Sequence, residues 1–247
     1  MSQHGGEAGF KSESDMAGPA CAAQCIRRRR ALPRPARAMG AARNKKPGQQ
    51  PICMVLIIDN GSQYTHLIKR TCRELGFDAE MLYSKAGYSQ VEEHMKTGIS
   101  RIILSGGPSS VYSDPPNISS MICQRVRDGG ILLPVFGVCY GHQMIAHTFG
   151  AKVEKGKSAE YGLGEISIDE EDVIFRGVPK KIRAWVSHYD EVKALPAGFM
   201  GLAHSDACAI EAMRHKERPI FSVQFHPEVW HTEHGEDMLR NFLESEK

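Results

Sequence analysis

A cysteine at a predicted turn has the surroundings of a nucleophile. Cys139 lies at the centre of Gly-Val-Cys-Tyr-Gly, residues 137–141, directly after a continuous apolar stretch over residues 131–136. A short helical pattern follows and stops at Gly150. The apolar stretch predicts a strand buried on both faces, so the thiol falls at a strand-to-helix turn. Its spacing is that of a G-x-S-x-G nucleophile elbow with sulfur in place of oxygen, and the helix N-terminus would favour a thiolate.

The flanking glycines separate this cysteine from an ordinary buried one. A lone cysteine after an apolar strand is usually a small core residue. A tight, strained turn brings neighbouring backbone together, however, and side chains at Gly137 and Gly141 would collide there. We therefore interpret Cys139 as a candidate nucleophile.

A histidine at a second strand end is a candidate general base. The apolar segment at residues 220–225 is followed by His-Pro-Glu at residues 226–228. An imidazole that is held and charge-balanced by a carboxylate suits acid–base catalysis, although a lone histidine at a strand end is more often a surface or core residue. The alternative is a metal site built from His226, His231 and His234. Their spacing fits no zinc signature, so we expect no metal in this chain.

A third strand end carries two adjacent glycines. The predicted strand at residues 101–104 leads into Ser-Gly-Gly-Pro at residues 105–108. Bare backbone N–H groups there could point at an anion, although Gly-Gly-Pro is more often only a turn. The phosphate-loop pattern G-x-x-x-x-G-K-[ST] occurs nowhere in the sequence. We therefore expect no ATP site and no cofactor in this chain.

The elements that must position these residues alternate between strand and helix from Met54 onward. This order predicts a doubly wound, mostly parallel α/β sheet with flanking helices, in which functional residues gather at the carboxyl ends of the strands. Beyond Gly150 the pattern predicts a small antiparallel extension and a closing helix. The predicted parallel strands are residues 55–59, 79–83, 101–104 and 131–136, and the helices between them include residues 89–97 and 118–128. The predicted antiparallel strands are residues 164–168, 181–186, 207–213 and 220–225, and the closing helix is residues 237–243.

The first 53 residues differ from the rest of the chain. Residues 1–53 hold ten Lys/Arg and three Asp/Glu, a net charge of +7, while the remainder carries −5. This segment is rich in Ala, Gly, Pro and Arg and contains one aromatic residue. It cannot bury enough apolar surface to offset its ordering entropy, so we predict a disordered basic extension before one domain at residues 54–247. An acidic body with a basic tail is not typical of a nucleic-acid-binding domain.

Composition limits the class of protein further. With 247 residues and 41% hydrophobic content, the chain can bury one sizeable core. No apolar run approaches the ~20 residues of a membrane span, so we expect no membrane association. The seven cysteines are odd in number and lack paired spacing, and a secretory signal is absent. These features favour a reducing compartment, and we expect a cytoplasmic protein.

Together the three motifs are far more specific than any one of them. Gly-Val-Cys-Tyr-Gly-His-Gln at residues 137–143, Ser-Gly-Gly-Pro at 105–108 and His-Pro-Glu at 226–228 closely resemble the class I glutamine amidotransferases, whose sheet is flavodoxin-like. The resemblance extends from Met54 to the C-terminus.

The resemblance assigns roles residue by residue. It implies that Cys139 is the nucleophile, His226 the acid and base, and Glu228 the partner that orients the imidazole. The residues whose backbone N–H groups would hold the oxyanion are Gly107 and Tyr140. The residues that would bind the substrate are Gln143, Ser187, Tyr189 and Asp190, the last as partner of the α-ammonium group. Bacterial GMP synthetases usually have glycine where Tyr189 stands, so a contact role for Tyr189 is the weakest of these assignments.

Further segments look most like the glutaminase part of GMP synthetases, namely residues 59–64, 185–192 and 204–235. The sequence stops at Lys247, without the ATP pyrophosphatase domain that follows in one-chain relatives, which resembles the archaeal two-subunit arrangement. This implies a subunit that hydrolyses glutamine to glutamate and ammonia. A separate ATP pyrophosphatase (synthetase) subunit would bind ATP and Mg²⁺ and use the ammonia to aminate XMP to GMP. The alternatives are an amidotransferase of anthranilate or carbamoyl phosphate synthesis, or a catalytically silent regulatory subunit on the same fold.

Overall fold

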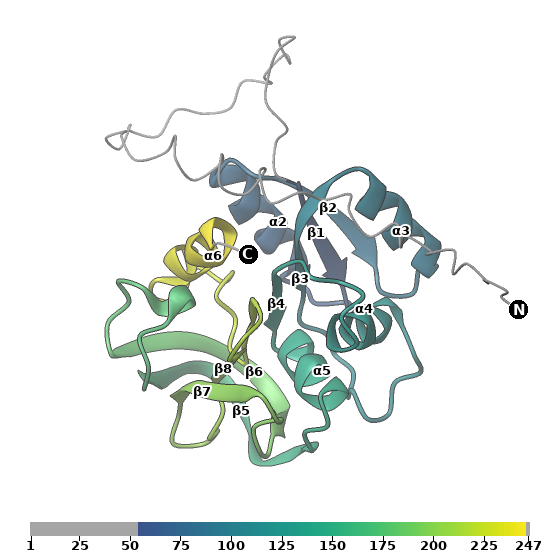
Figure 1. Ribbon diagram of the computed structural model, residues 1–247. Helices are drawn as coiled ribbons and strands as arrows, with labels where there is room; N and C mark the ends of the chain where they lie inside the picture. Colours follow the sequence, from purple (N-terminus) through teal and green to yellow (C-terminus); the bar gives the residue numbers. More distant parts are fainter. Residues whose placement is uncertain (1–53, 246–247) are drawn as a thin grey trace, which may run out of the picture.

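Strands and helices alternate to build a single sheet that is covered on both faces (Figure 1). The computed structural model describes residues 54–245. Within them, nine strands form one sheet in the order β2-β1-β3-β4-β9-β8-β7-β5-β6. The predicted basic extension at residues 1–53 lies outside the described residues. Every helix in the described range is too short or too polar to cross a lipid bilayer.

The parallel part of the sheet comes mainly from the first half of the described chain. β1 pairs in parallel with β2 and β3, and β4 pairs in parallel with β3 and with β9. This confirms the predicted doubly wound, mostly parallel α/β class. The elements of this part are β1 (Met54–Asp59), α2 (Thr65–Glu74), β2 (Asp78–Tyr83), α3 (Tyr88–Lys96), β3 (Ile99–Leu104), α4 (Ile118–Arg127), β4 (Val135–Val138), α5 (Tyr140–Thr148) and β9 (Ile220–Val223).

The remaining strands pair antiparallel and continue the same sheet beyond β9. This confirms the predicted antiparallel extension, which is closed by a helix. Its elements are β5 (Val153–Ile168), the 3₁₀ turn η1 (Val173–Phe175), β6 (Lys181–Val192), β7 (Phe199–His204), β8 (Ala212–His215) and α6 (Gly235–Glu244).

Three predictions about this part are wrong, and one strand was not predicted. β9 was expected to be an antiparallel strand of the extension, but it pairs in parallel with β4 and antiparallel only with β8. The predicted strand at residues 207–213 is mostly a turn, because the N–H of Ser205 donates to the carbonyl of Cys208 and the N–H of Cys208 donates to the Ser205 hydroxyl. β5 is much longer than the predicted strand at residues 164–168, because its first half is polar and gives no apolar signal. β7 was not predicted at all.

The strand before the cysteine also differs from its prediction. β4 begins at Val135 and not at residue 131, and Leu132 is 73% exposed. Pro134 has no N–H to donate to a strand ladder, although its carbonyl still accepts from Ile102 at 3.0 Å. The ladder therefore starts only after the proline, and the apolar residues before it form the approach to the sheet.

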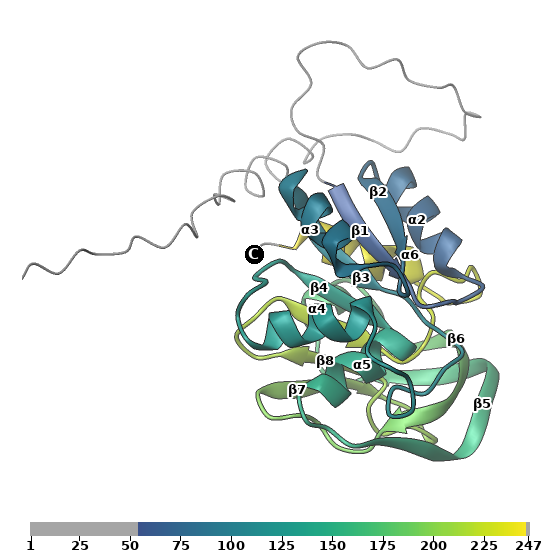
Figure 2. The ribbon, with the colours of Figure 1, turned by 90° about the vertical axis from the view of Figure 1, so that its right-hand side faces the viewer.

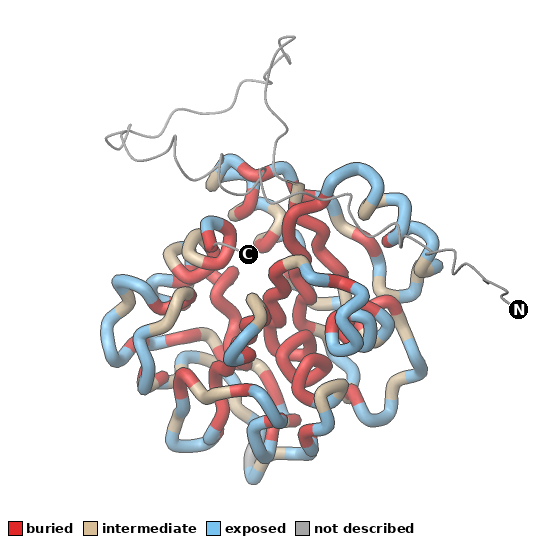
Figure 3. Tube along the Cα trace, in the orientation of Figure 1, coloured by how far each residue is buried: buried red, intermediate tan, exposed pale blue. Residues whose placement is uncertain are grey.

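Side-chain alternation along the strands divides the core between the two faces of the sheet. Val55 and Ile57 point to one face and pack in a cluster with buried residues of α2 and α6. Leu56 and Ile58 point to the other face and pack with buried residues of α3, α4 and α5. Figure 3 shows the resulting band of buried backbone along the parallel strands and α5. Burying both faces fixes the parallel strands, and with them the loops at their carboxyl ends.

The antiparallel strands curve away from the parallel ones, so the last strand of the sheet returns to the loop after β9 (Figures 1 and 2). The N–H of His226, just beyond β9, donates to the carbonyl of Trp185 on β6 at 2.9 Å. In return, the N–H of Trp185 donates to the Thr232 hydroxyl at 2.9 Å. These bonds bring residues of β6 next to the strand ends that carry the three motifs.

Candidate active site

The cysteine occupies a strained backbone position between β4 and α5. Cys139 has φ 50° and ψ −103°, and it is one of two non-glycine residues with positive φ in the described range. Such a conformation costs about 1–3 kcal/mol and persists only where the surroundings enforce it. Here the N–H of Cys139 donates to the carbonyl of Val223 on β9 at 2.9 Å, and its own carbonyl accepts from Gln143 in the first turn of α5 at 3.0 Å. The sulfur is thereby presented at the N-terminus of α5.

The steric requirement for the two glycines is confirmed. A Cβ on Gly137 would lie 2.7 Å from the backbone of Gly141 and 2.7 Å from the side chain of Ile145. A Cβ on Gly141 would overlap the carbonyl oxygen of Leu104 and lie 2.8 Å from its Cβ. The elbow can therefore lie against β3 only when both positions lack side chains.

Replacing Gly141 with alanine is expected to lower the free energy of unfolding by about 1–3 kcal/mol, because the added methyl group must displace the backbone of β3. Urea unfolding of the two proteins measures the change. Gly130→Ala is the matched control, since its Cβ would come no closer than 3.6 Å to any atom. Equal losses in both variants would contradict the proposed overlap.

The parallel pairing of β4 and β9 places the histidine beside the cysteine. Because both strands run in the same direction and are neighbours, Cys139 and His226 leave the sheet at the same edge. The Nδ1 atom of His226 lies 2.9 Å from Oε1 of Glu228, and the side chain of Glu228 is wholly buried. The thiol of Cys139 lies 3.8 Å from the carbonyl oxygen of Ser187, and Cys139 is close enough to His226 to raise the pKa of the imidazole. The three predicted triad side chains therefore lie together at this edge of the sheet.

The charges around His226 favour the protonated form of its imidazole. Burial by itself lowers the pKa of His226, but the carboxylate of Glu228 and the sulfur of Cys139, through charge and hydrogen bonds, together raise it well above its ordinary value. The ring also contacts Tyr64 edge-on, with centroids 5.2 Å apart. An imidazolium held in this way can protonate a leaving amine, and the neutral imidazole that results can then take a proton from water.

A pocket of about 510 Å³ opens over the sulfur. Most of the predicted site residues line it, namely Gly107, Cys139, Gln143, Ser187, Tyr189, Asp190 and His226. Glu228 lies behind His226 and does not line the pocket. The side chain of Tyr140 is buried away from it, where its hydroxyl donates to Asp114 at 2.9 Å, so only the backbone of Tyr140 is placed to serve the site.

The loop after β3 forms the wall opposite the cysteine. A Cβ on Gly107 would lie 2.6 Å from the carbonyl oxygen of Asn60, so the loop can pack this closely only with a bare backbone. Asn60, in the loop after β1, donates from its side chain to the carbonyl of Ser105 at 2.9 Å and from its N–H to the Ser105 hydroxyl at 3.0 Å. The loops after β1 and β3 therefore fix the position of Gly107 in the pocket wall.

One end of the pocket carries a carboxylate that is available to a cation. The carboxylate of Asp190 accepts hydrogen bonds from the hydroxyls of Ser110 and Tyr112. No basic side chain of residues 54–245 forms an ion pair with Asp190. The side-chain NH₂ group of Gln143 donates to the carbonyl of Asp190 at 2.7 Å and to Gln224 at 3.1 Å. Gln143 therefore positions Asp190, and its NH₂ group is already engaged within the protein.

Comparison with known proteins identifies the fold family. The sequence model of the family Glutamine amidotransferase class-I matches residues 56–245 of this chain. The chain belongs to this family. The resemblance inferred from the three motifs is thereby confirmed.

Individual relatives of this amidotransferase carry a more specific name. The A subunit of the glutamine-hydrolysing GMP synthase of Pyrococcus abyssi is 48% identical over 191 residues, which cover 76% of this chain and 96% of that protein. Its counterpart from Methanocaldococcus jannaschii, which has the same name, is 41% identical over 189 residues, covering 76% and 95%. A crystal structure from Thermoplasma acidophilum, described as a candidate for the same GMP synthase component, is 35% identical and superposes with a TM-score of 0.71 over 79% of this chain and 94% of that one.

Sequence reasoning missed several residues in the pocket of this amidotransferase. Lys155, Tyr161, Tyr64 and Ser110 line it, although none belongs to the three motifs. Lys155 on β5 stands opposite Asp190 on β6 in the strand register, and its Nζ lies 5.5 Å from the centre of the Tyr189 ring. The pairing of β5 with β6 brings this lysine to the pocket, and the prediction of β5 as a short strand concealed it.

Proposed function

We propose that this chain is the glutamine-hydrolysing subunit of a GMP synthase and releases ammonia from glutamine by means of Cys139. The observation that carries the proposal is the presence of Cys139 and His226 in one pocket, with Glu228 holding the imidazole from behind, in a chain 48% identical to a protein named for this activity. The retained triad also disfavours a catalytically silent subunit.

The chemistry follows from the order of the three side chains. The Cys139 thiolate attacks the side-chain amide carbon of glutamine and forms a tetrahedral intermediate. His226 gives its proton to the departing nitrogen, ammonia leaves, and a γ-glutamyl thioester remains on the sulfur. His226 then takes a proton from water, the hydroxide attacks the thioester, and glutamate leaves with the sulfur restored as thiolate. Glu228 orients the imidazole and balances its charge in both steps.

The pocket walls supply the remaining groups. The backbone N–H groups of Gly107 and Tyr140 would hold the oxyanion, one from the loop after β3 and one from the first turn of α5. Asp190 would bind the α-ammonium group of glutamine, with Gln143 holding its backbone in place. Ser187 and Tyr189 would line the path of the substrate, and Lys155 adds a positive charge for the α-carboxylate.

Replacing Lys155 with methionine is expected to raise KM for glutamine about fivefold with little change in kcat, because a charge pair at an exposed rim contributes up to about 1 kcal/mol to binding. Steady-state glutaminase kinetics measure both constants. Lys152→Met is the matched control, since Lys152 pairs with Glu154 and does not line the pocket. If KM were unchanged in the Lys155 variant, the lysine would have no part in substrate binding.

The released ammonia implies a partner. Ammonia that is protonated in bulk water is a poor nucleophile, so it should pass to a separate ATP pyrophosphatase subunit through a sheltered interface in a heterodimer. ATP and Mg²⁺ would bind to that partner. We place this heterodimer in the cytoplasm, because the cysteines of the described residues, Cys72, Cys123, Cys139 and Cys208, are all free and buried.

The test is to mix the purified full-length chain with the ATP-dependent subunit of a GMP synthetase and to ask which acceptor is aminated from glutamine. We expect GMP from XMP, ATP and glutamine, and a glutaminase rate that rises when XMP and ATP are present, because the partner gates the site. Amination of a different acceptor by a different synthase would overturn the assignment to GMP synthesis. A rate indifferent to the partner would overturn only the gating.

A further inference from the structure

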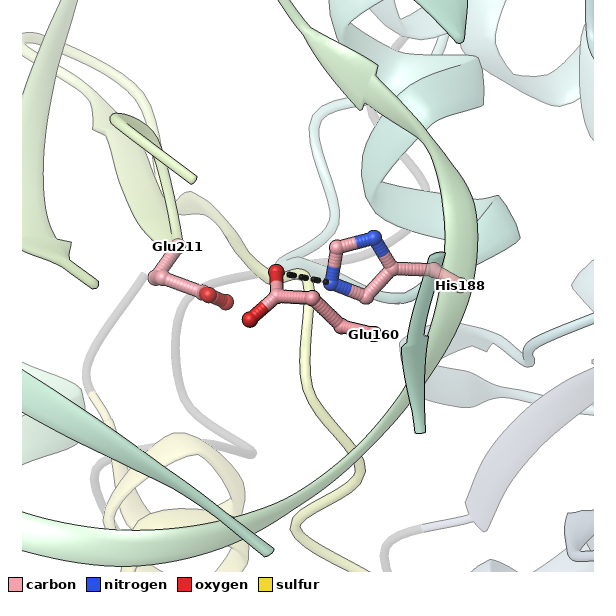
Figure 4. A group of neighbouring side chains, drawn as sticks. All are labelled: Glu160, His188 and Glu211. Carbon is pink, nitrogen blue, oxygen red and sulfur yellow. Dashed lines mark ion pairs between the residues drawn. The ribbon is translucent and has the colours of Figure 1, made fainter. Parts of the chain in front are cut away.

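Two glutamates and a histidine form a cluster beside the glutamine pocket, with His188 and Glu211 buried and Glu160 half-buried (Figure 4). Glu160 comes from β5, His188 from β6, and Glu211 from the position directly before β8. One nitrogen or oxygen atom of each side chain lies within 4.8 Å of the corresponding atoms of the other two. The three residues are far apart in sequence and show no ligand spacing, so the sequence alone did not reveal the cluster.

The polar atoms that face one another in the cluster lack hydrogen-bond partners. Nε2 of His188 lies 3.2 Å from Oε2 of Glu160, yet neither atom makes a hydrogen bond. Glu211 is 0% exposed, and both of its carboxylate oxygens are without a hydrogen bond. Figure 4 shows the Glu211 carboxylate directed at Glu160 and His188. Buried polar groups that are left unpaired cost several kcal/mol, so this arrangement requires a further species among them.

A third acidic residue lies near the cluster. Glu191 is close enough to interact with Glu160 and Glu211, and Lys193 is already paired with Glu191 at 2.6 Å. A divalent cation held by Glu160, His188 and Glu211 would offset the charge of the carboxylates around it.

The histidine is oriented as a metal ligand would be. Its Nε2 atom faces the carboxylate of Glu160 and makes no hydrogen bond (Figure 4). An imidazole nitrogen in this position is free to serve as a ligand.

We propose that Glu160, His188 and Glu211 bind a divalent transition-metal ion such as Zn²⁺. Imidazole and carboxylate are both common zinc ligands, and two carboxylates neutralise the charge of the ion. In a tetrahedral zinc site with bonds of about 2.1 Å, neighbouring ligand atoms lie about 3.4 Å apart. The 3.2 Å between Glu160 and His188 matches that separation, and the atom of Glu211, which lies within 4.8 Å of the other two, would have to move inward by at most about 1.4 Å.

The ion would act on the glutamine pocket through the backbone. It would join β5, β6 and the start of β8 at His188, which lines the pocket between Ser187 and Tyr189. The cluster residues are thus positioning residues, and the ion takes no part in the chemistry at Cys139. The competing explanation for the cluster is a single proton shared between Glu160 and Glu211.

The test measures Zn²⁺ binding to the full-length chain in a background that lacks competing thiols: Cys139→Ser, Cys21→Ser and Cys25→Ser. Isothermal titration of the metal-free protein with Zn²⁺ should show one site that Glu211→Gln weakens at least tenfold, and Zn²⁺ should raise Tm of the background protein but not of that variant. Glu165→Gln is the matched control. It lies on the same strand as Glu160, but its carboxylate is exposed and pairs with Lys181, so it should bind Zn²⁺ as the background protein does.

A second measurement does not depend on any variant in the cluster. X-ray absorption of the background protein loaded with one equivalent of Zn²⁺ should show nitrogen and oxygen ligands, including one imidazole, and no sulfur. Equal Zn²⁺ affinity in the Glu211→Gln and Glu165→Gln variants would overturn the proposal in favour of a shared proton. A zinc spectrum with sulfur ligands or several imidazoles would overturn it as well, because the ion would then lie elsewhere in the chain.

Discussion

Replacing Cys139 with alanine is expected to lower the rate of glutamine hydrolysis by at least about 10⁴-fold, because no other group can form the thioester. The fold should survive, since alanine fills most of the space of a side chain that is 5% exposed. The measurement is glutamate release by the purified chain. With the synthetase partner and free ammonium salt, formation of GMP should continue at the wild-type rate, because ammonia then bypasses this site.

Cys123→Ala is the matched control for this experiment. Cys123 is also buried, but burial raises the pKa of its thiol to about 12 and it lies in the helix core around α4, so its loss should leave glutamine hydrolysis nearly unchanged. Glutamine-dependent activity that persisted in Cys139→Ala would show that the nucleophile has been assigned to the wrong residue. Loss of ammonia-dependent activity would instead point to damage at the interface with the partner.

Replacing Glu228 with glutamine is expected to lower kcat by between about 10²- and 10⁴-fold and to shift its pH dependence. The negative charge of Glu228 is the largest of the effects that raise the pKa of His226, since burial acts in the opposite direction. Removing that charge lowers the pKa of the imidazole. The imidazolium that protonates the departing ammonia is then lost at a lower pH, so the alkaline limb of the profile moves toward neutrality.

The profile of kcat against pH, measured from about pH 6 to pH 10, provides the test. Glu233→Gln is a suitable control. Glu233 lies on the same segment as Glu228, but its side chain is exposed and forms an ion pair with Arg183. An alkaline limb that stayed in place in the Glu228 variant would contradict a charge-balancing role. A change confined to KM would assign Glu228 to substrate binding instead.

Local patterns in the sequence were sufficient to predict the strand-to-helix turn at Cys139, the parallel strands and the family. The glycines around Cys139 specify a turn that only bare backbone can make, and the gaps of 2.7 Å at Gly137 show why. Apolar runs of strand length separated by helical periodicity specify a parallel sheet covered on both faces. These features depend on residues close together in the chain, so a single sequence reveals them.

Contacts between distant strands were decided only by the tertiary structure. The short strand β9 gave the same apolar signal as an antiparallel strand, and its place beside β4 follows from packing both of its faces against the two halves of the core. That place brings His226 to Cys139. The curvature of the antiparallel strands similarly brings Lys155 to the pocket and unites Glu160, His188 and Glu211. Strand order and curvature depend on the sum of many long-range contacts, and no short segment of the sequence records that sum.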